Sequence, residues 1–129
     1  MALTLEDRVL LQDLMGRYCL MVDAADEGWA DLFVEDGVLD GIYPEPLIGR
    51  EALRVVPRNA REGSGGFWRH HLTSVAIDEA AGGARLRAYN LVTDWRDGGK
   101  LVMNARYNVE AVRTPEGWRL KRVYAALDR

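Results

Sequence analysis

The hydrophobic residues of the chain follow two different periods. In residues 5–22 they recur every three to four positions, directly after Thr4 and Asp7, whose spacing is typical of a capping box. This pattern predicts a first helix over about 5–22. From residue 66 onward, apolar and polar residues alternate, which is the period of a strand with one buried face. The alternating runs predict four strands, over 67–77, 84–95, 101–112 and 118–127.

The segment between these two regions is less regular. Residues 29–36, "WADLFVED", predict a short second helix that ends near Asp36, and "GVLDGIY" predicts a short strand. Residues 50–66 predict a third helix, weakened or ended near Pro57. The turn sequences "DEAAGG", "RDGG" and "TPEG" are short enough to join only antiparallel strands. The fold class is therefore α+β, with helices on one face of a curved sheet.

Composition limits the classes of partner. The 129 residues predict one domain over 1–129, and 48% hydrophobic residues are enough to fill its core. A net charge of −3 with scattered arginines gives no reason to expect nucleic acid or a membrane surface as a partner. The N-terminal residues lack the basic region of a signal peptide, and the lone Cys19 excludes an internal disulfide. We expect a cytoplasmic protein.

Strand alternation separates the only two histidines, which are adjacent in "WRHHLTS". It places His70 on one face with Trp68, Leu72, Ser74 and Ala76, and His71 on the other. The corresponding apolar faces of the next two strands contain Asn90 and Tyr107. Few polar groups among apolar walls are typical of a ligand cavity, so we expect His70, Asn90 and Tyr107 to face one. His71 is expected at the rim or at a subunit contact.

Tyr18 and Asp23 are the candidate polar groups of the first helix. Five residues correspond to about 140° on an ideal helix, so both reach one pocket only if the helix ends between them. A carboxylate beside an imidazole would fix its tautomer and favour the protonated ring, which suits a general base. The competing interpretation is that Asp23 only caps the second helix. Equally, Tyr18, His70, Asn90 and Tyr107 could be structural residues, and Asp40 a turn residue.

The combination of these segments resembles a known family. The first helix ending in "YCLMVD", then "GWADLFVEDGVLDG", "LIGREALR", "HHLTS" and a meander, is similar to the SnoaL-like branch of the nuclear-transport-factor-2-like superfamily. This resemblance implies a cone-shaped roll, in which three N-terminal helices and a curved, mainly antiparallel sheet enclose a pocket. Members are commonly oligomers, so a homodimer or homotrimer is expected.

The pattern is most similar to the dehydratase-like members, such as scytalone dehydratase, bile-acid 7α-dehydratase and hexachlorocyclohexane dehydrochlorinase. Asp23 and His70 match their Asp–His dyad, and Tyr18 matches a catalytic tyrosine of the bile-acid enzyme. Ser74 stands where asparagine is common. The resemblance implies elimination from a small hydrophobic cyclic molecule, without metal or organic cofactor. We expect the substrate pocket to be lined by Asp40, Trp68, Asn90, Tyr107 and Phe33.

Two alternatives remain at this point. In the related ketosteroid isomerase, a helix tyrosine and an early-strand aspartate do the chemistry; here Tyr18 and Asp40 match those positions, while Tyr107 stands near the place of a third acid. The other alternative is a non-catalytic ligand-binding or assembly module, because this superfamily also contains subunits whose sheets serve as interfaces. The distance between the Asp23 carboxylate and the His70 ring distinguishes the dyad from the module.

Overall fold

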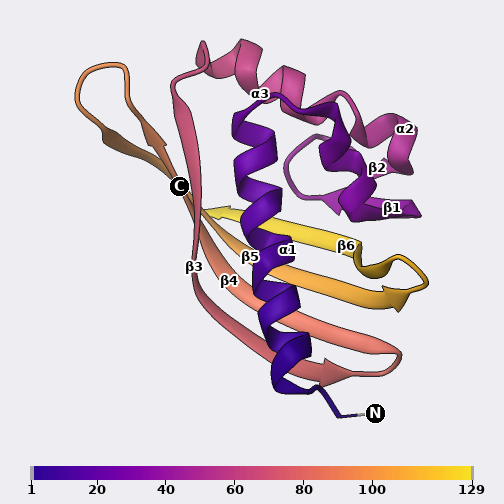
Figure 1. Cartoon of the computed structure of the whole chain (residues 1–129). Helices are drawn as coiled ribbons and strands as arrows, with labels where there is room; N and C mark the ends of the chain where they lie inside the picture. Colours follow the sequence, from indigo (N-terminus) through magenta and orange to yellow (C-terminus); the bar gives the residue numbers. More distant parts are fainter. Residues whose placement is uncertain (1, 129) are drawn as a thin grey trace.

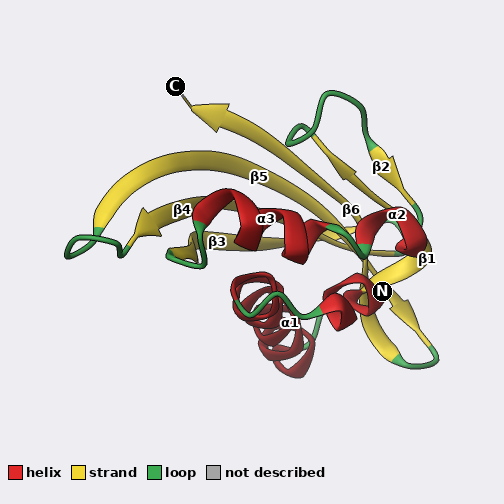
Figure 2. Ribbon diagram, turned by 90° about the horizontal axis from the view of Figure 1, so that it is seen from above, coloured by secondary structure: helices red, strands yellow, loops and turns green. Residues whose placement is uncertain are grey.

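The structure, a computed structural model, describes residues 2–128. Its six-stranded sheet is strongly curved and not closed, and the helices lie on its concave side (Figures 1 and 2). The strand order is β2-β1-β6-β5-β4-β3, and all neighbours are antiparallel except β1 and β6. The α+β class and the cone-shaped arrangement predicted from the sequence are therefore confirmed.

Helix α1 (Leu5–Asp23) matches the predicted first helix to within one residue. The capping box is present, because the Asp7 amide donates to Thr4 Oγ1 at 3.0 Å and the Thr4 amide donates to Asp7 Oδ2 at 2.8 Å. Its apolar stripe packs on the sheet and is buried, from Leu11 and Leu14 through Tyr18 to Val22. Figure 1 shows α1 crossing in front of the sheet, with its C-terminal end beside the upper part of β3.

The prediction of a second helix over residues 29–36 is wrong in its second half. A 3-10 helix, η1 (Glu27–Leu32), is followed directly by strand β1 (Phe33–Asp40). β1 pairs in parallel with β6 and antiparallel with the short β2 (Leu47–Ile48). The eight-residue pattern was too short to separate a helix from a strand, and long-range pairing with β6 decided the outcome.

The predicted third helix is two helices, α2 (Arg50–Leu53) and α3 (Val56–Ser64). Pro57 lies in the first turn of α3, where its missing N–H costs nothing, so the proline begins a helix rather than ending one. Helix α3 ends at Gly65, whose φ of 66° is the left-handed conformation that glycine adopts without strain. The break between α2 and α3 lets both follow the rim of the sheet (Figure 2).

The four predicted strands are confirmed as β3 (Trp68–Ala80), β4 (Gly83–Asp94), β5 (Lys100–Thr114) and β6 (Gly117–Asp128). The predicted inner face of β4 is also confirmed, because Ala84, Leu86, Ala88, Asn90 and Val92 are all buried. The predicted inner face of β3 is only half right. Ser74 has a φ of 56° and interrupts the pairing with β4 between Thr73 and Ala76.

This bulge reverses the alternation of β3 after Thr73. Ser74 and Ala76 are exposed, and Val75 and Ile77 pack against the core instead. The prediction that Ser74 and Ala76 share the face of His70 is therefore wrong. The bulge follows His70 in the chain, so the alternation that places the two histidines on opposite faces is unaffected.

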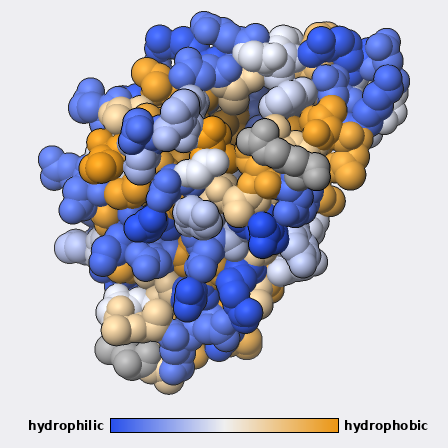
Figure 3. All heavy atoms as spheres, turned by 180° about the vertical axis from the view of Figure 1, so that it is seen from behind, coloured by the Kyte–Doolittle hydropathy of each residue, from blue (hydrophilic) through white to orange (hydrophobic). Residues whose placement is uncertain are grey.

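The outer face of the sheet is shown from behind in Figure 3, where groups of hydrophobic side chains lie among hydrophilic ones. Tyr89 and Tyr124 are exposed and flank a shallow depression together with Arg87 and Arg106. None of the helices among residues 2–128 is long and apolar enough to cross a membrane.

Asp7 ties the beginning of α1 to the sheet. Its carboxylate accepts hydrogen bonds from the Thr4 amide, from Arg113 at 2.7 Å and from Trp118 Nε1 at 3.2 Å. These hydrogen bonds lower the pKa of Asp7 from 3.8 to about 2, and the bond from the Thr4 amide has the largest effect. Burial of the carboxylate acts in the opposite direction.

We therefore expect acid to destabilise the fold through Asp7. Because the folded pKa lies below the unfolded value of 3.8, the unfolded chain takes up the proton first. The contribution is complete above pH ~4 and is lost between pH ~4 and ~2. Urea unfolding measured from pH ~2 to ~7 should show Asp7→Asn to be less stable than the wild type at neutral pH and its free energy of unfolding to depend less on pH. Asp13→Asn, an exposed change on the same helix, is the matched control and should keep the wild-type slope.

Candidate active site

A cavity of about 280 Å³ lies between the helices and the concave face of the sheet. Its lining is predominantly apolar and comes from almost every element of the fold. The lining residues are Tyr18, Val22, Trp29, Leu39, Ile42, Tyr43, Val56, Asn59, Ala60, Trp68, His70, Asn90, Val92, Met103, Ala105, Tyr107 and Leu127. Five of the eight residues that the sequence assigned to a site are among them: Tyr18, Trp68, His70, Asn90 and Tyr107.

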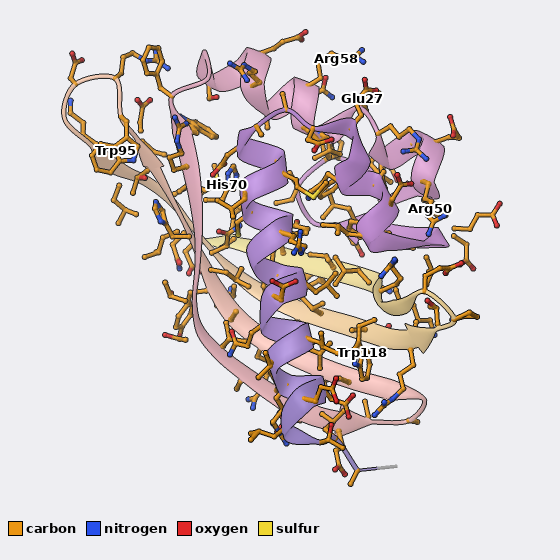
Figure 4. All side chains as sticks on the ribbon, in the orientation of Figure 1. Glu27, Arg50, Arg58, His70, Trp95 and Trp118 are labelled. Atoms are coloured by element: carbon orange, nitrogen blue, oxygen red, sulfur yellow. The ribbon has the colours of Figure 1, made fainter. Side chains whose placement is uncertain are left out.

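The structure brings Asp23 and His70 together. His70 Nδ1 lies 2.6 Å from Asp23 Oδ1, and the two side chains are only 11% and 16% exposed. The backbone N–H of His70 also donates to both carboxylate oxygens, at 3.2 and 3.1 Å. An ionised carboxylate only accepts hydrogen bonds, so in the neutral imidazole that pairs with it the proton is on Nδ1 and the lone pair is on Nε2. Figure 4 shows His70 between β3 and α1.

The geometry of Tyr18 and Asp23 differs from the expectation that the helix ends between them. α1 continues through Asp23, and only Ala25 turns into the left-handed region, with a φ of 55°. Tyr18 faces the main cavity, whereas Asp23 lines a small recess next to it. His70 lines both spaces. Each of the two helix residues therefore lines a space that His70 also lines, so the angle between them is no obstacle to a shared site.

The capping interpretation of Asp23 is wrong. The N-cap of η1 is Asp26, whose Oδ1 accepts from the Gly28 amide at 2.8 Å. Asp23 directs its carboxylate to His70 instead. An acid in the last turn of a helix opposes the helix dipole, at a cost of up to about 1 kcal/mol, so its contacts with His70 must offset that cost.

A hydrogen-bonded chain of three side chains lies in the cavity wall. Asn90 Nδ2 donates to the Tyr107 hydroxyl at 3.0 Å, and the hydroxyls of Tyr107 and Tyr18 are 3.1 Å apart. Burial raises the pKa of Tyr18 well above 10, with a further contribution from Tyr107, and burial also raises the pKa of Tyr107. Both phenols therefore keep their protons at neutral pH and act as hydrogen-bond donors rather than bases.

Cys19 and His71 take no part in the contacts of Asp23, His70 and the two tyrosines. Cys19 is buried, and its burial raises the pKa of the thiol to about 12, which disfavours the reactive thiolate. His71 is exposed on the outer face, where its Nε2 lies 2.9 Å from Thr93 Oγ1. A metal ion bound by both rings would require them on one face, and they lie on opposite faces.

The structure does not place Asp40 or Phe33 in the cavity lining, so both assignments are wrong. Asp40 is the last residue of β1, and its carboxylate forms an ion pair with Arg122 of β6, with 2.6 Å between Oδ2 and Nη2. Phe33 is completely buried in the core, where it packs against Trp29 and Tyr18 with ring centroids 5.0 and 6.4 Å apart. Asp40 was assigned from the resemblance to ketosteroid isomerase, and its pairing with Arg122 keeps it from the place that this resemblance implies.

Sequence reasoning missed several lining residues. Trp29 comes from η1, Tyr43 from the loop after β1, and Asn59 from α3. Asn59 is exposed and lies where the lining meets the surface, so it is a polar group at the cavity mouth. An aromatic residue in a short turn and an amide in a polar helix carry no periodic signal, and only the packed fold identifies them.

Comparison with known proteins agrees with the fold. The family described as the SnoaL-like domain matches residues 3–124. The chain belongs to this family. No curated protein matches this SnoaL-like chain.

Solved structures similar to this SnoaL-like domain extend over nearly all of it. A protein from Novosphingobium aromaticivorans, described provisionally as an aromatic ring hydroxylase, is 32% identical, with 98% of this chain and 92% of that chain covered and a TM-score of 0.78. A nuclear-transport-factor-2-like protein with a cystatin-like fold, from the same organism, is 27% identical, with 95% and 82% covered and a TM-score of 0.85. A Catenulispora acidiphila protein in complex with S-DNPA is 28% identical, with 92% and 90% covered and a TM-score of 0.77.

Proposed function

We propose that this SnoaL-like protein is a cofactor-independent lyase of the dehydratase type. Its substrate is a small, largely apolar cyclic molecule of the aromatic, polyketide or steroid kind, and its reaction is elimination of water. The observation that carries the proposal is the 2.6 Å contact between Asp23 and His70, with the imidazole lining an apolar cavity. The binding of a small molecule by the Catenulispora acidiphila relative also supports a ligand in this fold.

The mechanism follows from which atoms are already occupied. Asp23 holds Nδ1–H, so Nε2 is the ring atom that can take a proton from a carbon next to an activating group. The C–H bond breaks, its proton moves to His70, and a C=C bond forms as the neighbouring C–O bond breaks. The leaving oxygen takes a proton from the imidazolium, so water departs and His70 returns to the neutral form. Tyr18 donates a hydrogen bond to the oxygen on which charge develops.

Asp23 contributes by stabilising charge and orientation rather than by touching the substrate. Its carboxylate lies behind His70, outside the lining of the main cavity. When the ring takes a proton, the positive charge forms next to this carboxylate in a site that is largely shielded from water. The extra hydrogen bonds from the His70 amide keep the carboxylate in place.

The two alternatives are less well supported by the geometry. An isomerase that uses Asp40 requires this carboxylate in the cavity, and it is paired with Arg122 outside the lining. A non-catalytic module needs only the fold, but it gives no reason for a buried carboxylate paired with a cavity histidine. The exposed Tyr89 and Tyr124 on the outer face of the sheet suit a subunit contact, and we propose a homodimer or homotrimer built there.

A ligand screen followed by a turnover assay tests the proposed function. Cyclic hydroxyketones, steroids and polyketide-like rings are first tested for thermal stabilisation, because a ligand that binds the folded state raises apparent stability. Those that bind are then incubated with the protein, and formation of the conjugated double bond is followed by ultraviolet absorbance. Stabilisation without turnover of any hydroxyl-bearing ligand would favour the binding module.

Asp40 provides a direct test between the lyase and the isomerase. We expect Asp40→Asn to leave turnover essentially unchanged, because the change removes only a partly exposed ion pair with Arg122, worth about 0–1 kcal/mol. The rates of the variant and the wild type are compared at saturating substrate. Abolished activity in a folded Asp40→Asn protein would instead assign the reaction to the isomerase mechanism.

A further inference from the structure

Two residues of the cavity lining each have a buried polar atom without a hydrogen-bond partner. Buried side-chain atoms without a partner in residues 2–128 are few, namely Trp29 Nε1, Asn90 Oδ1 and Asn104 Oδ1. Trp29 and Asn90 both line the cavity and are 1% and 2% exposed. Buried polar groups in folded proteins are nearly always paired, so an unpaired donor and an unpaired acceptor in one cavity require an explanation.

The tyrosines between these two residues leave a third group unpaired. Tyr18 and Tyr107 carry two phenolic hydrogens, and the contact between their oxygens uses one of them. Tyr107 also accepts from Asn90 Nδ2. No other hydrogen bond of either hydroxyl occurs in the part of the chain that the structure describes, so one phenolic hydrogen is still available.

The three groups belong to one cluster. The ring centroids of Tyr18 and Trp29 are 5.2 Å apart, and those of Tyr18 and Tyr107 are 5.9 Å apart. Asn90 contacts Tyr107 directly. We call this part of the cavity the polar floor, and it consists of Tyr18, Trp29, Asn90 and Tyr107. It offers two donors, from the indole and a phenol, and one acceptor, from the amide.

We infer that the polar floor is a binding subsite for a hydroxyl group of the ligand. A hydroxyl has one donor hydrogen and two acceptor lone pairs, which is the complement of two donors and one acceptor. A carbonyl or an ether oxygen only accepts, so it would leave Asn90 Oδ1 buried and unpaired. The inference rests on the proposed function in taking the cavity as the substrate site, and it adds that the substrate presents a hydroxyl to the polar floor rather than a carbonyl.

Two matched bicyclic probes test this subsite by binding alone. 2-Naphthol carries a donor hydrogen, and 2-methoxynaphthalene has the same rings and an oxygen that only accepts. We expect the wild-type protein to bind 2-naphthol about tenfold more tightly, a difference that corresponds to about 1.4 kcal/mol. Dissociation constants are measured by calorimetry or by quenching of tryptophan fluorescence.

Two variants assign the preference to the polar floor. Asn90→Leu removes the acceptor, and we expect the preference for 2-naphthol to fall to about onefold while 2-methoxynaphthalene still binds. Trp29→Phe removes one donor, and it should weaken both probes because both supply an acceptor. Circular dichroism establishes that each variant is folded, and the wild-type ratio serves as the test if Asn90→Leu does not fold.

The possible results separate this inference from the proposed lyase activity. Equal affinity of the two probes for the wild-type protein, or no binding of either up to their solubility, would overturn the subsite and indicate that water alone occupies the floor. A preference that persists in folded Asn90→Leu would also overturn it. His70→Ala leaves the floor intact and should keep the tenfold preference. A failure of the dyad in turnover assays therefore leaves the subsite result standing, and the reverse also holds.

Discussion

His70→Ala is expected to lower turnover by about 10²–10⁴-fold, the usual contribution of a well-placed general base. The change removes Nε2, the ring atom that is free to take a proton once Asp23 holds Nδ1. The loss is measured as the rate constant for conversion of bound substrate under single-turnover conditions, with the hydroxyl-bearing substrate that the screen identifies. Binding of that substrate should change little, because the cavity walls are mainly apolar and the Tyr18, Asn90 and Tyr107 contacts remain.

The adjacent histidine is the natural control for this experiment. His71 belongs to the same strand but is exposed, and its Nε2 contacts Thr93 on the outer face. We expect His71→Ala to keep the wild-type rate. Unchanged turnover in a folded His70→Ala protein would rule out the dyad as the catalytic group, whereas equal losses in both variants would indicate a general effect on β3.

Asp23→Asn should produce the second largest loss, about 10²-fold in kcat. Asparagine keeps the size of the side chain but removes the negative charge next to the ring. Its amide can also donate to Nδ1, which would place the proton on Nε2 and leave no base facing the substrate. The loss should be smaller than for His70→Ala because the imidazole is still present.

Ligand affinity distinguishes this role from a structural one. Asp23 lies outside the lining of the main cavity, so the dissociation constant of 2-naphthol should be the same in Asp23→Asn and in the wild type. Asp13→Asn, an exposed change about three turns earlier on α1, is the matched control and should affect neither quantity. Loss of ligand affinity together with kcat would show instead that Asp23 mainly maintains the cavity.

The sequence predicted those parts of the site that depend on the period of a single element. Helical spacing placed Tyr18 on the buried side of α1, and strand alternation placed His70, Asn90 and Tyr107 on inner faces. The four strands and the meander were also predicted, because short glycine-containing turns between alternating runs allow few topologies. The contact between Asp23 and His70 was suggested by the family resemblance, and strand alternation independently selected His70 over His71.

The parts that failed depend on contacts between elements. β1 is a strand because it pairs with β6, some 80 positions later in the chain, and nothing in its eight residues encodes that partner. Trp29 and Asn59 reach the cavity through the packing of η1 and α3 above the sheet, which no period along the chain describes. The bulge at Ser74 depends on a single left-handed residue that is not a glycine, and alternation alone gave no sign of it.

The bulge at Ser74 divides the inner face of β3 into two parts with different tasks. Before it, β3 presents Trp68 and His70 to the cavity; after it, β3 presents Val75 and Ile77 to the core. Without the extra residue, the strand would alternate strictly, and all inward-facing side chains of β3 would have to occupy either even or odd positions. With it, substitutions that reshape the ligand end of β3 and substitutions that repack its core end become independent, so specificity can diverge in this scaffold without disturbing the residues that hold the sheet to α1.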